Sequence, residues 1–231
     1  MNVWKLEKGS AKGVVIACTI IVFWLMAMLG ALLTPVGYSL PLNILLILLL
    51  THLYTGLFIT AHDAMHGAVS WNRKVNLFFG QLCTTLFMFN SFKVLFPKHY
   101  DHHKFAGTEN DPDYHPPHPV KWYLKFLLEY ISLRQLILAA ITFNLLRLWF
   151  PVPNLLLFWI LPSLLSTLQL FIFGTYLPHH GEHQPQNRHR ARSQHKNHFL
   201  AFITCYFFGY HYEHHDSPQT PWWLLHKMKD R

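Results

Sequence analysis

Histidines in three clusters are the residues of this chain whose type and spacing could do chemistry. Residues 211–215 and residues 99–103 both have the spacing H-x-x-H-H, and residues 62–66 have the spacing H-x-x-x-H. On a helix, positions i, i+3 and i+4 lie on one face, so each cluster would direct its imidazoles the same way. Such a set favours a metal site over ordinary packing, because imidazole is the commonest protein ligand of metals. The clustered histidines are His62, His66, His99, His102, His103, His211, His214 and His215.

The number of these histidines limits the kind of metal site. A structural zinc ion needs four ligands and a catalytic zinc ion needs three, so the clusters exceed any single zinc site. Two metal ions, each held by four or five imidazoles with one position open, would use them. Imidazole binds zinc, copper, iron and nickel, so the ligand type does not name the metal. An apolar protein without an evident hydrolytic nucleophile favours iron, since a di-iron centre activates dioxygen for attack on hydrocarbon C–H bonds.

Acidic residues inside the clusters have two open interpretations. Asp63, Asp101 and Glu213 could accept hydrogen bonds from imidazoles and so orient them. They could equally be solvated residues on the outer face of each helix. The spacing does not decide between these roles.

Other classes of metal protein fit the pattern less well. Residues 62–66 resemble the zinc-protease motif H-E-x-x-H, but Asp63 replaces the glutamate base and both H-x-x-H-H clusters stay unexplained. A metal transporter would need carboxylates or paired histidines within its membrane spans, and the apolar segments lack them. A non-catalytic metal-binding membrane protein stays open as an alternative, which iron content together with oxygen-dependent product formation would separate from an enzyme.

The composition indicates an integral membrane protein. The chain is 52% hydrophobic and only 13% charged, which is too apolar for an ordinary soluble domain. Cys18, Cys83 and Cys205 lie in apolar segments without C-x-x-C spacing, so neither a disulfide framework nor a thiolate metal site is indicated. The net charge of +8 falls between long uncharged segments and records membrane topology, so we expect a lipid membrane as partner and no nucleic acid.

The elements that must position the clusters are membrane helices. Four segments are long and apolar enough to span a bilayer, which takes about 20 residues; they are Val14–Leu33, Leu40–Thr60, Tyr123–Phe150 and Asn154–Leu177, the last with a kink expected at Pro162. The polar content of Val75–Phe92 favours a pair of short interfacial or re-entrant helices instead of a span. No internal repeat is apparent. We therefore predict an all-α fold, a membrane helical bundle of about four spans in a single domain, 1–231.

The charges predict which side of the membrane carries the histidines. The loops at Thr34–Ser39 and Phe150–Asn154 contain no charged residue, whereas the lysines and arginines flank the opposite ends of the spans. Basic residues are retained on the cytoplasmic side of membrane proteins. All histidine clusters are therefore expected on the cytoplasmic face of a multi-pass protein.

The clusters and their neighbours resemble the membrane fatty-acid desaturase and hydroxylase superfamily. The stretch His102–Asp113 looks like the second histidine motif of that superfamily and the Asp-Pro pair after it. The carotenoid ketolase family is closer still, and the likeness covers roughly residues 55–225. The matching segments are His62–Gly67, Asp111–His115, Phe173–His179 and Phe208–Trp223.

The resemblance implies oxidation of C4 of the β-ionone ring of β-carotene to a ketone, giving echinenone and canthaxanthin. Two successive hydroxylations and loss of water from the geminal diol would form the ketone. The resemblance also implies two iron ions, dioxygen as cosubstrate, a carotenoid substrate and an electron donor such as ferredoxin. A carotenoid ring hydroxylase and a fatty-acid desaturase remain alternatives with the same iron chemistry.

The resemblance also extends the set of site residues. It adds His179 as a ninth iron ligand, whereas His180 stands at a position that is usually basic in the family and is expected not to bind metal. Phe207 stands where ketolases often carry histidine, so no ligand is expected there. Apart from the resemblance, the candidates for supporting the ligands from outside are Asp63, Asp111, Asp113, His115 and Glu213, with the roles of Asp63 and Glu213 left open as above.

Overall fold

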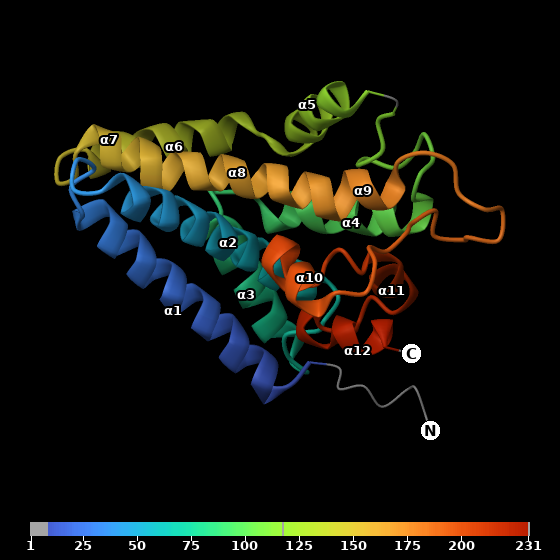
Figure 1. Ribbon diagram of the computed structural model, residues 1–231. Coiled ribbons are helices and arrows are strands. Elements are labelled where there is room, and N and C mark those ends of the chain that lie inside the picture. The colour runs from blue at the N-terminus through green and yellow to red at the C-terminus, as the bar shows by residue number, and fades with distance from the viewer. Residues whose placement is uncertain (1–8, 117, 231) are drawn as a thin grey trace.

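The computed structural model describes residues 9–116 and 118–230, and these residues form helices and connecting turns without a strand (Figure 1). The fold is all-α, as predicted. Lys5, Lys8 and Pro117 lie outside the described residues. The helices run side by side as a bundle, and α2 packs against α1, α3 and α8 at its centre. The bounds of the first two are α1, Ala11–Leu33, and α2, Leu40–Met65.

Three helices are long and apolar enough to cross a membrane: α1, α2 and the continuous helix Val152–His179. Side chains cap the starts of α1 and α2. The Ser10 hydroxyl accepts the backbone N–H of Gly13 at the start of α1, and the Ser39 hydroxyl accepts that of Leu42 at the start of α2. These caps satisfy backbone groups that the first turn of a helix leaves unpaired. The protein is an integral membrane protein.

Two short helices, α3 (Arg73–Leu86) and α4 (Phe92–Phe105), follow the second span. No further span lies in this fully described stretch, as expected, but Val75–Phe92 holds only α3 and the turn after it, and the second helix of the pair begins at Phe92. Met88 and Phe89 have φ values of 54° and 59°, which turn the chain back between the two helices. Gly80 lies against the ring of Phe92, and a Cβ atom there would collide with it. The close approach brings α4 alongside α3.

The segment Tyr123–Phe150, expected as the third span, is broken by a bend. The structure has two helices, α5 (Pro119–Tyr130) and α6 (Leu133–Leu146), which meet at 82°. The sequence between them stops one helix and starts another, because the Ser132 hydroxyl caps α6 by accepting the N–H of Gln135. Glu129 pairs with Lys98 of α4 at 2.7 Å, which holds α5 against the end of the bundle. The spans therefore number three, or four if this bent pair crosses as one.

The last span contains two π-helical turns. Its parts are α7 (Val152–Asn154), η2 (Leu155–Ile160), α8 (Leu161–Leu170), η3 (Phe171–Tyr176) and α9 (Leu177–His179). Pro162 and Pro178 each stand at the second position after a π turn. A proline lacks the N–H that would bond to the preceding turn, and its ring needs space there. The widened π turn provides that space. The irregularity expected at Pro162 is therefore a local change in the hydrogen-bond register of the helix.

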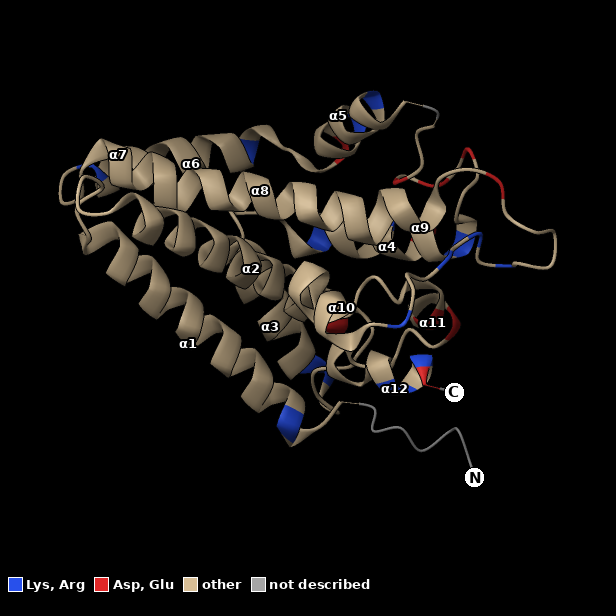
Figure 2. Ribbon diagram, viewed as in Figure 1, with Lys and Arg blue, Asp and Glu red and all other residues tan. Residues whose placement is uncertain are grey.

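Short helices and a long loop close the bundle at one end. They are α10 (His198–Cys205), α11 (His211–Asp216), η4 (Trp222–Leu224) and α12 (Leu225–Lys229). In Figure 1 they lie beside the ends of α2, α4 and α9, next to the start of α1. Figure 2 shows that most charged residues gather at this end, whereas the long helices carry few. We call it the histidine end, because all three clusters reach it.

Candidate metal centre

The histidines form two groups at the histidine end. In the first group the ring nitrogens of five histidines lie within 4.8 Å of one another. In the second, those of four histidines meet the same limit. The first group is His62, His66, His99, His103 and His214; the second is His102, His179, His211 and His215. Together they hold the nine histidines that the sequence singled out as ligands.

Each H-x-x-H-H cluster is divided between the two groups. On α4, His99 and His103 face the first group while His102 faces the second. On α11, His214 joins the first group while the histidines one turn apart, His211 and His215, join the second. Two such helices facing each other thus build two sites. The expectation that each cluster converges on one point is corrected by this division.

The Nε2 atoms converge within each group. Nε2 of His66 lies 2.6 Å from that of His99, and Nε2 of His103 lies 3.0 Å from that of His214. In the second group, His211 Nε2 lies 3.0 Å from the Nε2 atoms of both His179 and His215. Neutral imidazoles cannot all donate to one another across such contacts. Several lone pairs therefore point at shared positions.

Burial keeps these imidazoles neutral. It lowers the pKa of His66 to about 3 and, with the charges of neighbouring histidines, lowers the pKa of His103 to about 2. The pKa values of four others lie well below normal, first because of burial and then because of neighbouring histidines: His99, His211, His214 and His215. A neutral imidazole offers the lone pair that a metal ion requires.

Buried ring nitrogens without a hydrogen-bond partner indicate whether these residues fit a metal ion. Both ring nitrogens of His62 are buried without a hydrogen-bond partner among the described residues. An unsatisfied buried polar group costs about 1–3 kcal/mol. A cation bound by one of these nitrogens would satisfy that atom. The donor set, all imidazole, suits zinc, copper, iron or nickel, so the nine residues fit a pair of such ions.

Two histidines of the second group are held by hydrogen bonds to acceptors outside the group. The Nδ1–H of His102 donates to Asp111 Oδ1 at 2.9 Å, and that of His179 donates to the carbonyl oxygen of Arg190 at 2.8 Å. Burial opposes the charged form of His102, but the bond to Asp111 and the charges of Asp111 and Asp113 outweigh it and raise its pKa. Both rings thereby keep Nε2 directed at the group, an arrangement that orients metal ligands.

The other residues expected to support ligands take different positions. Asp63 accepts the backbone N–H of Trp222 at 3.0 Å, and its nearest oxygen lies 3.6 Å from His62 Nδ1, too far for a hydrogen bond. Glu213 accepts the Ser193 hydroxyl and pairs with Lys229 at 3.0 Å, so it ties α11 to α12 and bonds to no histidine of either group.

Asp113, His115 and Asp101 complete this set. Asp113 accepts the Tyr130 hydroxyl, and one of its oxygens lies 3.9 Å from His102 Nδ1. Burial raises the pKa of Asp113 to about 6. His115 is half-buried, with Nε2 unpaired among the described residues, and belongs to neither group. Asp101 is exposed on the outer face of α4. The acidic residues inside the clusters therefore differ in role.

His180 lies outside both groups, unlike its neighbour His179. Its Nδ1–H points back along the helix to the carbonyl oxygens of Tyr176 and Leu177, at 3.1 and 3.0 Å. Phe207 packs against Trp222 and Tyr210, also away from the groups. These positions agree with the expectation that neither residue contributes a ligand.

An apolar cavity of about 80 Å³ borders both groups; we call it the inner cavity. Its wall includes His62 and His99 of the first group and His102 and His211 of the second. The rest of the wall is largely aromatic and aliphatic and includes Phe58, Met65, Phe87, Leu95, Phe126, Leu170 and Phe208. A small apolar molecule in this cavity would lie against both sets of imidazoles.

A sequence model of the fatty acid desaturase family matches residues 38–139 and 127–231, which is most of the chain. The chain belongs to the fatty acid desaturase family. The match includes both histidine groups, α2 and the last span, Val152–His179. The resemblance to this superfamily, inferred from the histidine motifs, is thus confirmed.

Relatives within this desaturase family are named as ketolases. A beta-carotene ketolase of a Paracoccus strain is 42% identical over 184 residues, 76% of this chain and 74% of that protein. A beta-carotene ketolase of Haematococcus lacustris is 36% identical over 97% of this chain and 81% of that protein. A zeaxanthin 4-ketolase of Chlamydomonas reinhardtii is 41% identical over 78% of this chain, but the match spans only 42% of the algal protein.

Sequence reasoning missed three partners of this desaturase-family site. They are the Tyr130 hydroxyl, which donates to Asp113, the Arg190 carbonyl, which accepts from His179, and the Trp222 backbone N–H, which donates to Asp63. Two of the three are backbone groups, which leave no signal in residue type. Tyr130 lay within the expected third span, so only the bend between α5 and α6 reveals its role.

Proposed function

We propose that this chain is a carotenoid ketolase, which uses dioxygen to oxidise C4 of the β-ionone ring of β-carotene to a ketone. One observation carries the proposal: two groups of largely buried imidazoles share the wall of an apolar cavity. The names of its relatives support the choice of substrate and reaction. The expected products are echinenone and canthaxanthin, formed through two hydroxylations at C4 and loss of water from the geminal diol.

The nine grouped histidines would hold two iron ions, five imidazoles in the first group and four in the second. Iron bound there would supply the activation of dioxygen that C–H oxidation requires. Burial favours the neutral form of most of these imidazoles, and hydrogen bonds to Asp111 and to the Arg190 carbonyl orient His102 and His179. Asp111 and Asp113 place negative charge beside the second group, which favours a bound cation.

The inner cavity would receive the ring of the substrate. Phe58, Phe87 and Phe126 offer apolar surface to a cyclohexene ring and exclude water from it. His62 and His102 lie in the same wall, so C4 of a bound ring would face both groups. The allylic C–H bonds at C4 are weaker than those at C3, so the same oxidant attacks C4 more easily. Apolar walls suit an unsubstituted ring that comes from the bilayer.

An electron donor is part of the proposal, because hydroxylation with dioxygen takes electrons from outside the substrate. The exposed side chains of Arg188 and Arg192 lie on the loop that carries the Arg190 carbonyl, close to the second group. A basic surface favours association with an acidic carrier such as ferredoxin.

The cytoplasmic location of the histidine end is likewise proposed from charge, because basic residues gather there and positions 34–39 carry none. Cysteines at Gln184 and Tyr38, both exposed, test it after Cys18 is replaced by alanine. A membrane-impermeant thiol reagent should label position 184 only from the cytoplasm and position 38 only from the other side. Labelling of position 38 from the cytoplasm would reverse the topology.

Expression in bacteria that accumulate β-carotene tests the activity directly. Chromatography should reveal echinenone and canthaxanthin, and the colour should shift toward red because the ketone extends the conjugated system. Zeaxanthin as product would identify a ring hydroxylase, and new unsaturated fatty acids beside unchanged carotene would identify a desaturase. Bound iron without any oxygen-dependent product would identify a non-catalytic metal protein.

A further inference from the structure

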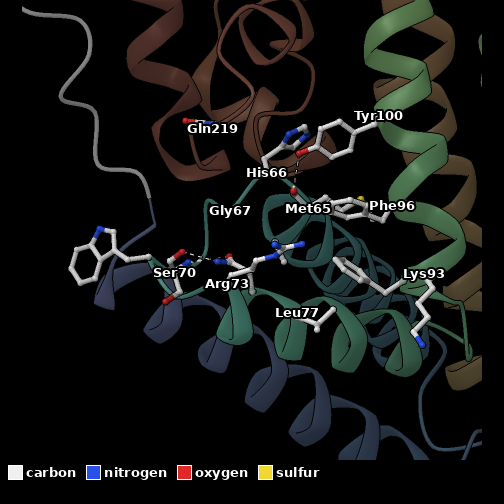
Figure 3. A pocket seen from close by; sticks show the side chains of 14 residues that line it. Met65, His66, Gly67, Ser70, Arg73, Leu77, Lys93, Phe96, Tyr100 and Gln219 are labelled. Atoms are coloured by element: carbon white, nitrogen blue, oxygen red, sulfur yellow. Dashed lines mark hydrogen bonds between the residues drawn. The ribbon is translucent and has the colours of Figure 1, made fainter.

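A second hollow, which we call the basic groove, lies beside the turn that follows α2. Its volume is about 790 Å³, within the usual range for a ligand site. It is formed by α3, α4 and the segment around Gln219, as Figure 3 shows. Met65 lines both this groove and the inner cavity, and His66 lines the groove from the first group. The groove is therefore separate from the cavity but shares one wall with it.

The charge in the groove is positive and unbalanced. Arg73 and Lys93 line it, and the side chain of neither forms a hydrogen bond or ion pair with any residue that the structure describes. Figure 3 shows the Arg73 side chain turned into the groove, with Lys93 at its edge on α4. No aspartate or glutamate is among the lining residues. Two cations over one hollow without a counter-charge attract an anionic group.

The remaining wall has polar residues near Ser70 and Gln219 and exposed apolar residues along α3 and α4. Leu77 on α3 and Phe96 on α4 line the groove with 46% and 37% of their surface exposed. Trp71, at the entrance, is 74% exposed. An inorganic anion would leave these side chains uncovered, whereas the alkyl part of an amphiphile would cover them.

The position of the groove matches the boundary of a membrane. A Cβ atom on Gly13, in the first turn of α1, would collide with the backbone of Val69 in the turn beside the groove. That turn is thus level with the start of the first span. Tryptophan and basic residues gather at this depth in membrane proteins, and basic pockets between helices bind anionic lipid headgroups.

We propose that the basic groove binds an anionic phospholipid, with its phosphate against Arg73 and Lys93 and an acyl chain along Leu77 and Phe96. The headgroup then rests against the turn that carries His66, where the Tyr100 hydroxyl donates to the Met65 carbonyl at 3.3 Å. Lipid binding stabilises that turn. The proposal does not depend on the ketolase reaction, because neither iron nor carotenoid takes part in it.

Native mass spectrometry of the full chain in detergent tests this, with phosphatidylglycerol or phosphatidylcholine added. Phosphatidylglycerol should bind one molecule per chain more tightly than phosphatidylcholine. The double variant Arg73→Gln/Lys93→Gln should bind it roughly 30-fold more weakly, the factor for two cations at about 1 kcal/mol each. The matched control is Lys74→Gln/Lys121→Gln, two exposed lysines that do not line the groove, and it should retain full affinity.

Three results would overturn the proposal. They are equal affinity for the two lipids, full affinity in the double variant, or an equal loss in the control. Displacement of the lipid by glycerol phosphate at similar concentration would assign the groove to a free phosphate instead. If the double variant does not fold, Lys93→Gln alone, at an exposed position, should still weaken binding by roughly fivefold; unchanged affinity there counts against the proposal.

Discussion

The two histidine groups are built from the same helices but are supported differently. In the second group all four histidines are buried, and two are fixed by hydrogen bonds to Asp111 and to the Arg190 carbonyl. In the first group His99 and His103 are half-buried, and His62 has no partner for either nitrogen among the described residues. The protein therefore preorganises the second group through His102 and His179, although Nδ1 of His211 and of His215 is unpaired among the described residues, whereas the first group depends more on the ion that it would bind.

Loss of a single ligand should give the largest effect in either group. His179→Ala removes an imidazole from the second group, so we expect ketone formation to be abolished and iron content to fall. The neighbouring variant His180→Arg is the control, because His180 bonds only to its own helix, and it should keep most of the activity. Iron analysis and pigment chromatography measure both outcomes. If His179→Ala stayed active and His180→Arg lost activity, His180 and not His179 would be the ligand.

Substitution of an acidic residue beside each group should show that the second group depends on such a residue more than the first does. Asp111→Asn weakens the charge-assisted bond to His102 and should lower activity or iron affinity about 10–100-fold, as such changes do at other metal sites. Asp63→Asn should cost much less, since Asp63 lies beyond hydrogen-bonding distance of His62 and an amide oxygen can still accept the Trp222 N–H. Equal losses in the two variants would show that the groups are supported alike.

Chelation should release iron in two phases. The first group is partly exposed through His99 and His103, so a chelator should remove its ion several-fold faster than the ion of the buried second group. Iron remaining on the protein, followed over time, gives the two rates. The Asp111→Asn variant should accelerate only the slow phase. A single phase in the unmodified protein would contradict the difference in support.

The smallest effect is expected at Glu213, which lies within a histidine motif but contacts neither group. Glu213→Gln removes the ion pair with Lys229, and a partly exposed pair of this kind contributes about 0–1 kcal/mol. Ketone formation should stay within about threefold, with a small decrease in the melting temperature. A loss as large as that of Asp111→Asn would mean that Glu213 supports a ligand.

Much of the site could be predicted from the sequence. The H-x-x-H-H spacing identified the histidines that converge, because helical periodicity is a local property of the chain. The lengths of the apolar segments placed three of the four expected spans for the same reason. Resemblance between motifs added His179, which no spacing links to the other histidines. The all-α class and the family followed from these features.

The tertiary structure decided how those residues are shared. Periodicity sets the angle between His102 and His103 on α4 but not which neighbouring helix each ring meets, so only packing against α9 and α11 divides them between two groups. The placement of α5 and the contacts of Glu213 likewise depend on partners in other helices, Lys98 and Lys229. Local sequence determines which way a side chain can point along its helix; the residues that it meets are determined by the packing of other segments.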